Sequence, residues 1–429
     1  MKKIICLIII ALACLGLTAC NIGTSPAPYY LFVFNSKSMN DEDIAAIQGL
    51  SDLYPGYDLV FVDACEQNNA AKVYQLLLQE RDTRGYDPCG IQIFGTPNAV
   101  PAFEHKHEFE NQSQTEMNKY DDFVSDYFYT NFNNDPVALE KISAYELSGR
   151  LDEIDIVPAW HVVRLPLLRG DFADFITKYR EYLSLIEDRD IVNISVSSPI
   201  LPVGWYSVAM DDTGYFLTRA RAEWGFIDDV RLFGTTEGVY ASTLDLDGSC
   251  NVEDWAPLTE QNVCEIFHES HAGKDTLTQT IFTGRGKEEY YCKDVLTTQT
   301  INRKLNGMPY FLNTGGCQPA KGMTGNIITK ALSGRCVGAI AATTVLHGVD
   351  IDCMLTGDEY VQDYNRYSLL YGYLKAKSEG ATRAEAFCAG QKQVAQAFIQ
   401  HAGTTDVLGY QSNLNNLLAF QNFGLIDPK

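Results

Sequence analysis

One histidine and one cysteine stand at positions where the chain could do chemistry. His271 follows the apolar run Val263 to Phe267, and Cys317 follows a second apolar run, Pro309 to Leu312. Each run predicts a buried strand, and open α/β sheets hold their active sites beyond the carboxyl ends of parallel strands. A thiol becomes a useful nucleophile when a neighbouring imidazole takes its proton. The pattern therefore predicts a pair in which His271 is the general base and Cys317 the nucleophile.

The glycines beside this pair could serve the same chemistry. The backbone N–H groups of Gly273 and Cys317 are the expected donors to an oxyanion, and Gly315 and Gly316 would let the backbone bend sharply and let a substrate approach closely. His268 lacks an adjacent glycine and is expected to be structural, and His347 follows Cys317 and is expected at the rim. Glu269 could anchor the imidazole, but we expect a surface charge.

The segments around the pair alternate between strand and helix patterns. Short apolar runs such as Tyr29 to Phe34 and Cys336 to Thr344 indicate strands, and runs such as Phe172 to Ile186 indicate helices. This alternation favours largely parallel β-sheets with helices on both faces. The charged run Glu187 to Asp190 is the expected seam between two α/β halves, residues 29–190 and 191–429.

Five stretches together resemble the gingipains, a family of caspase-like cysteine peptidases. They are "HESHAG" and "NTGGCQPA" around the pair, "GIQIFGTPNAVP" (Gly90 to Pro101), "VSDYFY" (Val124 to Tyr129) and "DIVPAWHVVRLPLLRGDF" (from Asp155). The resemblance implies a caspase-like (caspase–hemoglobinase) fold and hydrolysis of peptide bonds, with cleavage after Arg or Lys as the first expectation. It also implies that Asp211 and Asp212 lie near the family's pocket acid, although two acids at a helix start equally fit N-terminal capping.

Two departures from the family keep a second function open. Gingipains have Gly directly after the catalytic His, whereas here Ala272 precedes Gly273. The stretch that should carry a supporting Glu, "ISVSSPILPVGW", contains no carboxylate. The alternatives to a peptidase are an inactive gingipain-like surface protein that binds a protein or glycan, and a solute-binding lipoprotein.

The N-terminus has the pattern of a bacterial lipoprotein signal. Lys2 and Lys3 precede an apolar run from Ile4 to Leu17, and small residues precede Cys20. We expect a signal peptide over residues 1–19, a lipidated Cys20 with a tether over 20–28, and export to the cell envelope with a membrane anchor. A plain secretory signal with an incidental cysteine is the alternative.

Charge and cysteine content restrict partners and cofactors. The formal net charge is −22, and it becomes −24 without the two signal lysines, so nucleic acid is not an expected partner. Of twelve cysteines, nine follow Cys20, and an odd number in an exported chain leaves at least one unpaired. Cys264 and Cys336 are expected to be buried. No cofactor or metal is predicted, although four acids could collect calcium: Asp121, Asp122, Asp126 and Asp135. A solvated acidic loop, with Asp126 capping a turn, is favoured for them.

Overall fold

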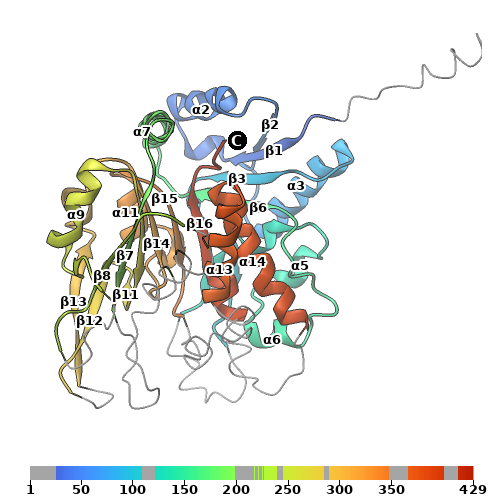
Figure 1. Ribbon diagram of the computed structural model, residues 1–429. Coiled ribbons are helices and arrows are strands. Elements are labelled where there is room, and N and C mark those ends of the chain that lie inside the picture. The colour runs from blue at the N-terminus through green and yellow to red at the C-terminus, as the bar shows by residue number, and fades with distance from the viewer. Residues whose placement is uncertain are drawn as a thin grey trace, which may run out of the picture.

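An eleven-stranded sheet runs through the whole molecule (Figure 1), as seen in a computed structural model. The structure describes residues 26–108, 121–198, 217, 221, 225, 227–238, 245–284, 289–346, 366–400 and 414–428. The strand order is β2-β1-β3-β6-β16-β15-β14-β10-β7-β8-β9. The bounds, in that order, are Asp58–Asp63, Tyr29–Phe34, Gly90–Phe94, His161–Leu165, Phe420–Gly424, Cys336–Ala342, Tyr310–Thr314, Cys264–Glu269, Val192–Ser197, Val230–Gly234 and Gly248–Ser249.

The predicted α/β class with a largely parallel sheet and helices on both faces is confirmed. Within the described part of the chain, only the β15–β16 pair of this sheet is antiparallel. The sheet is continuous across the predicted seam, because β16 from the end of the chain also bonds to β6 of the first half. In the sheet order, the strands from β2 to β16 therefore run in one direction, and those from β15 to β9 run in the opposite direction. The carboxyl ends of β10 and β14 lie at the same edge of the sheet.

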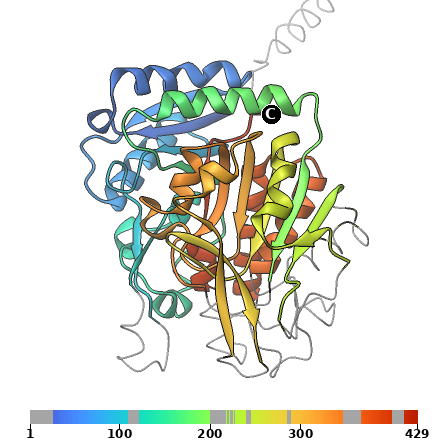
Figure 2. The ribbon, with the colours of Figure 1, turned by 90° about the vertical axis from the view of Figure 1, so that its left-hand side faces the viewer.

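Helices cover both faces of the sheet and divide the interior into two apolar layers. One face carries α2 (Asp41–Gln48), α7 (Phe172–Ile186), α9 (Val252–Gln261) and α11 (Ile327–Leu332). The other carries α3 (Ala70–Arg84), α5 (Pro136–Leu139), α6 (Ala144–Ser148), α13 (Arg366–Ser378) and α14 (Arg383–Gln400). Figure 2 shows the first of these faces, with α2 and α7 side by side along the top of the view. Burial on both faces explains why β15 is apolar along its full length.

Local sequence signals set the ends of several helices. Asn40 begins α2 with a capping box in which its side chain and that of Asp43 bond each other's backbone N–H. Asp43 also accepts hydrogen bonds from the backbone N–H groups of Gly170 and Phe172, which tie α2 to the start of α7. Gly85 ends α3 with φ of 78°, a left-handed conformation that glycine adopts without strain.

A small second sheet leaves the main one next to β10. It consists of β11 (Ala272–Gly273), β12 (Thr276–Phe282) and β13 (Tyr290–Thr297), all antiparallel. The sequence pattern did not predict this sheet. Figures 1 and 2 show β12 and β13 as a ribbon that projects from the body of the protein. Two further short strands, β4 (Phe103–His105) and β5 (Phe123–Ser125), pair in the first half, and α10 (Ile301–Lys304) precedes β14.

None of the helices in the described ranges is long and apolar enough to cross a membrane.

Candidate active site

His271 and Cys317 follow two strands that pair directly with each other. β10 and β14 are parallel neighbours, and His268 lies opposite Thr314 in their register. His271 lies three residues after His268, and Cys317 lies three residues after Thr314. Neighbouring strands lie about 4.8 Å apart, so the two turns start side by side at one edge of the sheet. Both residues are partly exposed.

The turn that carries His271 is held by the small sheet. The backbone carbonyl of His271 accepts hydrogen bonds from both the N–H of Thr278 (3.1 Å) and its hydroxyl (2.6 Å). The ladder between β12 and β13 shifts register between Leu277 and Thr278, which marks a bulge at this point. The imidazole ring lies nearly parallel to the ring of Tyr290, with 6.1 Å between centroids. These contacts fix the backbone of His271 and orient its ring.

Two glycines allow the turn that carries Cys317 to pack against the turn of His271. A Cβ on Gly316 would lie 2.4 Å from the Cβ of Ala272 and 2.7 Å from the carbonyl oxygen of Ser270. A Cβ on Gly315 would lie 1.7 Å from a carboxylate oxygen of Glu269. At Gly316 the obstacles include the backbone of Ser270 and Ala272, so a glycine is required there by close approach rather than by φ, whereas a side chain at Gly315 would have to displace the Glu269 carboxylate.

The amide of Gly316 is already used within this turn. Its N–H donates to the hydroxyl of Thr314 at 3.2 Å, and the N–H of Gly315 donates to the carbonyl of His268 at 2.9 Å. The N–H of Gly316 is therefore already bonded, and the absence of a side chain at this residue permits the close packing of the two turns. Gly273 lies in β11, opposite Thr276.

His268 has the structural position that the sequence suggested. The side chain is buried, one ring nitrogen lies 3.1 Å from the Thr314 hydroxyl, and the other lies 2.8 Å from the carbonyl oxygen of Thr278. Burial lowers the pKa of His268 to about 4. A neutral ring that bridges β14 and β12 in this way braces both turns of the site.

Glu269 is not a surface charge, contrary to the expectation. It is the last residue of β10 and is 5 % exposed, with its carboxylate against the Cα of Gly315. The predicted strand ended at Phe267, two residues too early. Because β10 continues to Glu269 and is buried on both faces, this carboxylate lies inside the protein. A prediction of the full length of the strand would have indicated that Glu269 is buried.

Serines occupy the end of β7, in the stretch where the family resemblance implies a supporting carboxylate. The hydroxyl of Ser198 donates to that of Ser270 at 2.6 Å and accepts from the N–H of Thr280 at 2.9 Å. The hydroxyl of Ser270 also lies 3.2 Å from that of Thr280. This buried hydroxyl network joins β7, β10 and β12 just before His271. It stabilises the position of the base but adds no negative charge.

Cys317 differs from the buried thiols of the chain. Burial raises the pKa of Cys264 to about 12, that of Cys336 to about 11 and that of Cys388 to about 12. The predicted burial of Cys264 and Cys336 is confirmed. Cys317 is only partly buried, and its Sγ lies 3.7 Å from the carbonyl oxygen of Leu346. Within the described part of the chain, no two cysteines are joined in a disulfide.

Three of the four acids considered for calcium have other partners. Asp126 forms a two-pronged ion pair with Arg164, 2.6 Å at each contact, and both side chains are buried. Asp135 caps α5, and Asp121 pairs with Lys321. Within the described ranges, no three His, Cys, Asp or Glu side chains are grouped as metal ligands would be. Cys20, His347, Asp211 and Asp212 lie outside the described residues.

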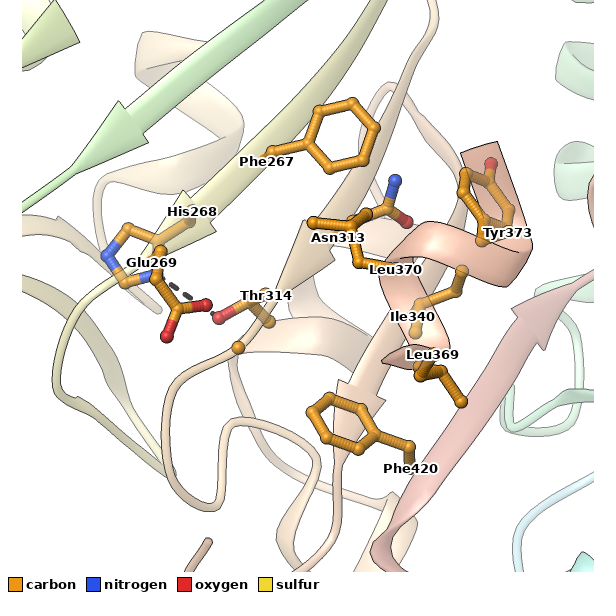
Figure 3. A pocket seen from close by; sticks show the side chains of 11 residues that line it. Phe267, His268, Glu269, Asn313, Thr314, Ile340, Leu369, Leu370, Tyr373 and Phe420 are labelled. Atoms are coloured by element: carbon orange, nitrogen blue, oxygen red, sulfur yellow. Dashed lines mark hydrogen bonds between the residues drawn. The ribbon is translucent and has the colours of Figure 1, made fainter. Parts of the chain in front are cut away.

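A cavity of about 60 Å³ adjoins the ends of β10 and β14 on the α13 side of the sheet (Figure 3). Glu269 and Gly315 line it at the strand ends, and Asn313 lines it two residues further into the sheet. Its other walls are mostly apolar. The site thus combines a thiol, an imidazole and an adjacent recess at one edge of the sheet.

The fold matches solved structures of cysteine proteinases. Gingipain R, described as an Arg-specific cysteine proteinase, superposes with a TM-score of 0.60 at 10 % identity, over 94 % of this chain and 77 % of that one. A structure described as a protease superposes with a TM-score of 0.58 at 11 % identity, over 94 % of this chain and 78 % of that one. The complex of the pro- and mature domains of RgpB from Porphyromonas gingivalis superposes with a TM-score of 0.56 at 10 % identity, over 93 % of this chain and 78 % of that one.

At this identity the likeness shows the fold, which is the gingipain or caspase-like fold. No protein-family model matches the sequence. No sequence relative is found among curated proteins.

Proposed function

We propose that this protein is a cysteine peptidase in which Cys317 is the nucleophile and His271 the general base. The observation that carries the proposal is the pairing of β10 with β14, which starts the two turns at adjacent positions of one sheet edge. Close packing of Gly316 against Ser270 and Ala272 holds the turns together. The fold shared with cysteine proteinases adds support.

The reaction would follow the usual course of a cysteine–histidine pair. The imidazole of His271 takes the thiol proton, and the thiolate of Cys317 attacks the peptide carbonyl carbon. The C–N bond then breaks, and the imidazolium gives its proton to the leaving amine. Water, deprotonated by the imidazole, attacks the thioester and releases the carboxylate and the thiol. Backbone N–H groups of Cys317 and Gly273 are the proposed donors to the oxyanion.

A catalytically inactive surface protein that binds a protein or glycan is the second candidate. Two observations favour it: the serines at the end of β7 provide no carboxylate to support His271, and Ala272 separates His271 from Gly273. The bulge at Leu277 and Thr278 and the double hydrogen bond to the His271 carbonyl argue for the peptidase, because they hold the base without a supporting acid.

Selective alkylation of the thiols tests the two functions. The purified protein is treated with iodoacetamide at pH 7, and each cysteine is followed by peptide mass spectrometry. The peptidase predicts that Cys317 reacts faster than the exposed Cys292, and that His271→Ala removes the difference. Equal rates at Cys317 and Cys292 would favour the binding protein. Cleavage of peptides with Arg or Lys before the scissile bond, the specificity we propose from the family resemblance, is then measured.

We also propose that the protein is exported and anchored by a lipid on Cys20. The observation is the order of charged, apolar and small residues before that cysteine. Metabolic labelling with palmitate, followed by membrane fractionation, would give a labelled membrane protein that Cys20→Ala converts to an unlabelled one. Labelling that survives the substitution would contradict the anchor.

A further inference from the structure

The outer strand of the small sheet begins beside the proposed general base. β13 lies at one edge of that sheet, and within the described part of the chain it pairs with β12 alone. Its first residue is Tyr290, whose ring lies nearly parallel to the imidazole of His271. Figure 1 shows β12 and β13 projecting together from the body of the protein. An open strand edge therefore starts next to His271.

Contacts of β12 show which of its backbone groups point away from β13. The N–H of Thr278 donates to the carbonyl of His271 at 3.1 Å. The N–H of Thr280 donates to the hydroxyl of Ser198 at 2.9 Å. Neither N–H is therefore used in the ladder with β13. In an antiparallel ladder, this identifies Thr278 and Thr280 as members of non-hydrogen-bonded pairs.

The partners of these two residues present their backbone groups at the edge of the sheet. Asp294 lies opposite Thr278, and Cys292 lies opposite Thr280. Both members of a non-hydrogen-bonded pair direct their N–H and C=O groups away from each other. The N–H and C=O groups of Cys292 and Asp294 therefore point to the open side of β13. The alternation along a strand adds Tyr290 to this set.

This edge is accessible and carries negative charge. The first five residues of β13 are all exposed. Glu289 and Asp294 are exposed acids, whereas the ammonium of Lys293 is held by the side-chain oxygen of Asn251 at 2.7 Å. An exposed edge is a template for an added strand, and main-chain hydrogen bonds then supply the affinity. Carboxylates beside the edge favour basic side chains in that strand.

We propose that the outer edge of β13 binds the segment of a protein substrate that follows the scissile bond, as an added strand with basic side chains. This inference rests on the proposed peptidase. The imidazolium of His271 gives its proton to the leaving amine, so the residue after the scissile bond lies against His271. The chain that continues from that residue meets Tyr290 and then the rest of the edge. Such a peptidase needs several residues after the bond and acts within chains.

Hydrogen exchange tests the pairing apart from catalysis. The probe is a ten-residue peptide with lysine at its fifth position and further lysines after it, added to the Cys317→Ser protein. We expect the amides of Cys292 and Asp294 to exchange at least about tenfold more slowly when the peptide is bound, because the added strand accepts hydrogen bonds from them. Unchanged exchange of both amides at a saturating peptide concentration overturns the proposal.

Methylated peptides test the two-residue period of the pairing. Two versions of the probe carry N-methyl groups on alternate residues after the fifth, one on the even and one on the odd positions. Only every second residue of an added strand directs its N–H to the edge. One version should therefore bind as the parent does, and the other at least about tenfold more weakly. Equal affinities of the two versions overturn the proposal.

A proline in β13 tests the role of the edge in cleavage. Cys292→Pro removes an N–H that points outward and leaves the ladder with β12 intact, and Cys292→Ala is the control for the lost side chain. Peptides with four residues after the scissile bond are compared with peptides that have one. The ratio of their kcat/KM values within each variant cancels any change in the reactivity of Cys317.

We expect this ratio to be at least about ten in the wild type and in Cys292→Ala, and to approach one in Cys292→Pro. A ratio near one in the wild type, an equal ratio in Cys292→Pro, or faster cleavage when glutamates replace the lysines after the bond overturns the proposal. If no peptide is cleaved while the exchange of Cys292 and Asp294 slows as expected, the peptidase proposal fails and the pairing stands. Cleavage without slowed exchange has the opposite meaning.

Discussion

The contact between Gly316 and the turn of His271 provides a direct test of the site geometry. In Gly316→Ala, the new Cβ would lie 2.4 Å from the Cβ of Ala272 and 2.7 Å from the carbonyl oxygen of Ser270. Carbon atoms pack at about 3.5 Å or more, so the two turns must separate by about 1 Å. Both obstacles belong to the segment that carries His271, and the added methyl belongs to the segment that carries Cys317. The substitution therefore increases the separation of the proposed base and nucleophile.

A displacement of about 1 Å at a catalytic group costs on the order of 100-fold in rate, or about 2.7 kcal/mol of transition-state stabilisation. We expect Gly316→Ala to lower kcat/KM for peptides by about that factor and to remove the preferential alkylation of Cys317. The overpacking should also lower the free energy of unfolding by about 1–3 kcal/mol. Kinetics and urea denaturation of the same samples measure the two effects separately.

Gly322→Ala is the matched control for this loss of stability. Gly322 lies five residues after Cys317 with φ of 67°, and an added Cβ there meets open space. The left-handed conformation makes alanine unfavourable by about 1 kcal/mol without pushing any neighbour. Its Cys317 reactivity should therefore match the wild type. Full activity in Gly316→Ala, or an equal loss in both variants, would refute the idea that the two turns must be in contact.

Three further perturbations test other parts of the structure. Thr278→Val removes the hydrogen bond from the Thr278 hydroxyl to the carbonyl of His271 and should slow Cys317 alkylation several-fold, whereas Thr278→Ser should restore the rate. Equal alkylation rates in Thr278→Val and the wild type would show that this bond does not position the base. Asp126→Asn leaves the buried Arg164 without its charge partner and should lower the free energy of unfolding by about 3–5 kcal/mol in urea, whereas a loss below about 1 kcal/mol would contradict this. Burial lowers the pKa of His268 to about 4, so the unfolded chain binds this proton first, and up to about 3 kcal/mol of stability should be lost as pH falls from about 6.5 to 4. Urea denaturation at several pH values between about 6.5 and 4 measures this loss. In His268→Gln the free energy of unfolding should depend less on pH over this range, and an unchanged pH dependence would contradict the lowered pKa of His268.

The alternation of strands and helices was readable from the sequence because it depends on neighbouring residues. Apolar runs such as Tyr29–Phe34 and Cys336–Ala342 became central strands with nearly the predicted bounds. The same local pattern placed His271 and Cys317 after two strand ends. Periodicity and turn residues carry this information within a window of a few residues, so it survives without knowledge of the rest of the chain.

Pairing between distant segments decided the rest, because it depends on which surfaces meet in space. The sequence alone did not show that β16 joins the two halves, that β12 and β13 hold the carbonyl of His271, or that Ser198 and Ser270 bond where a carboxylate was sought. Glu269 was misplaced for the same reason: a charged residue at the end of a strand reads as solvated unless its neighbours are known. Only the tertiary contacts of β10 with β14 and the cover of α13 bury it beside Gly315 and make it part of a recess. The sequence supplied the reactive groups, and long-range packing determined what surrounds them.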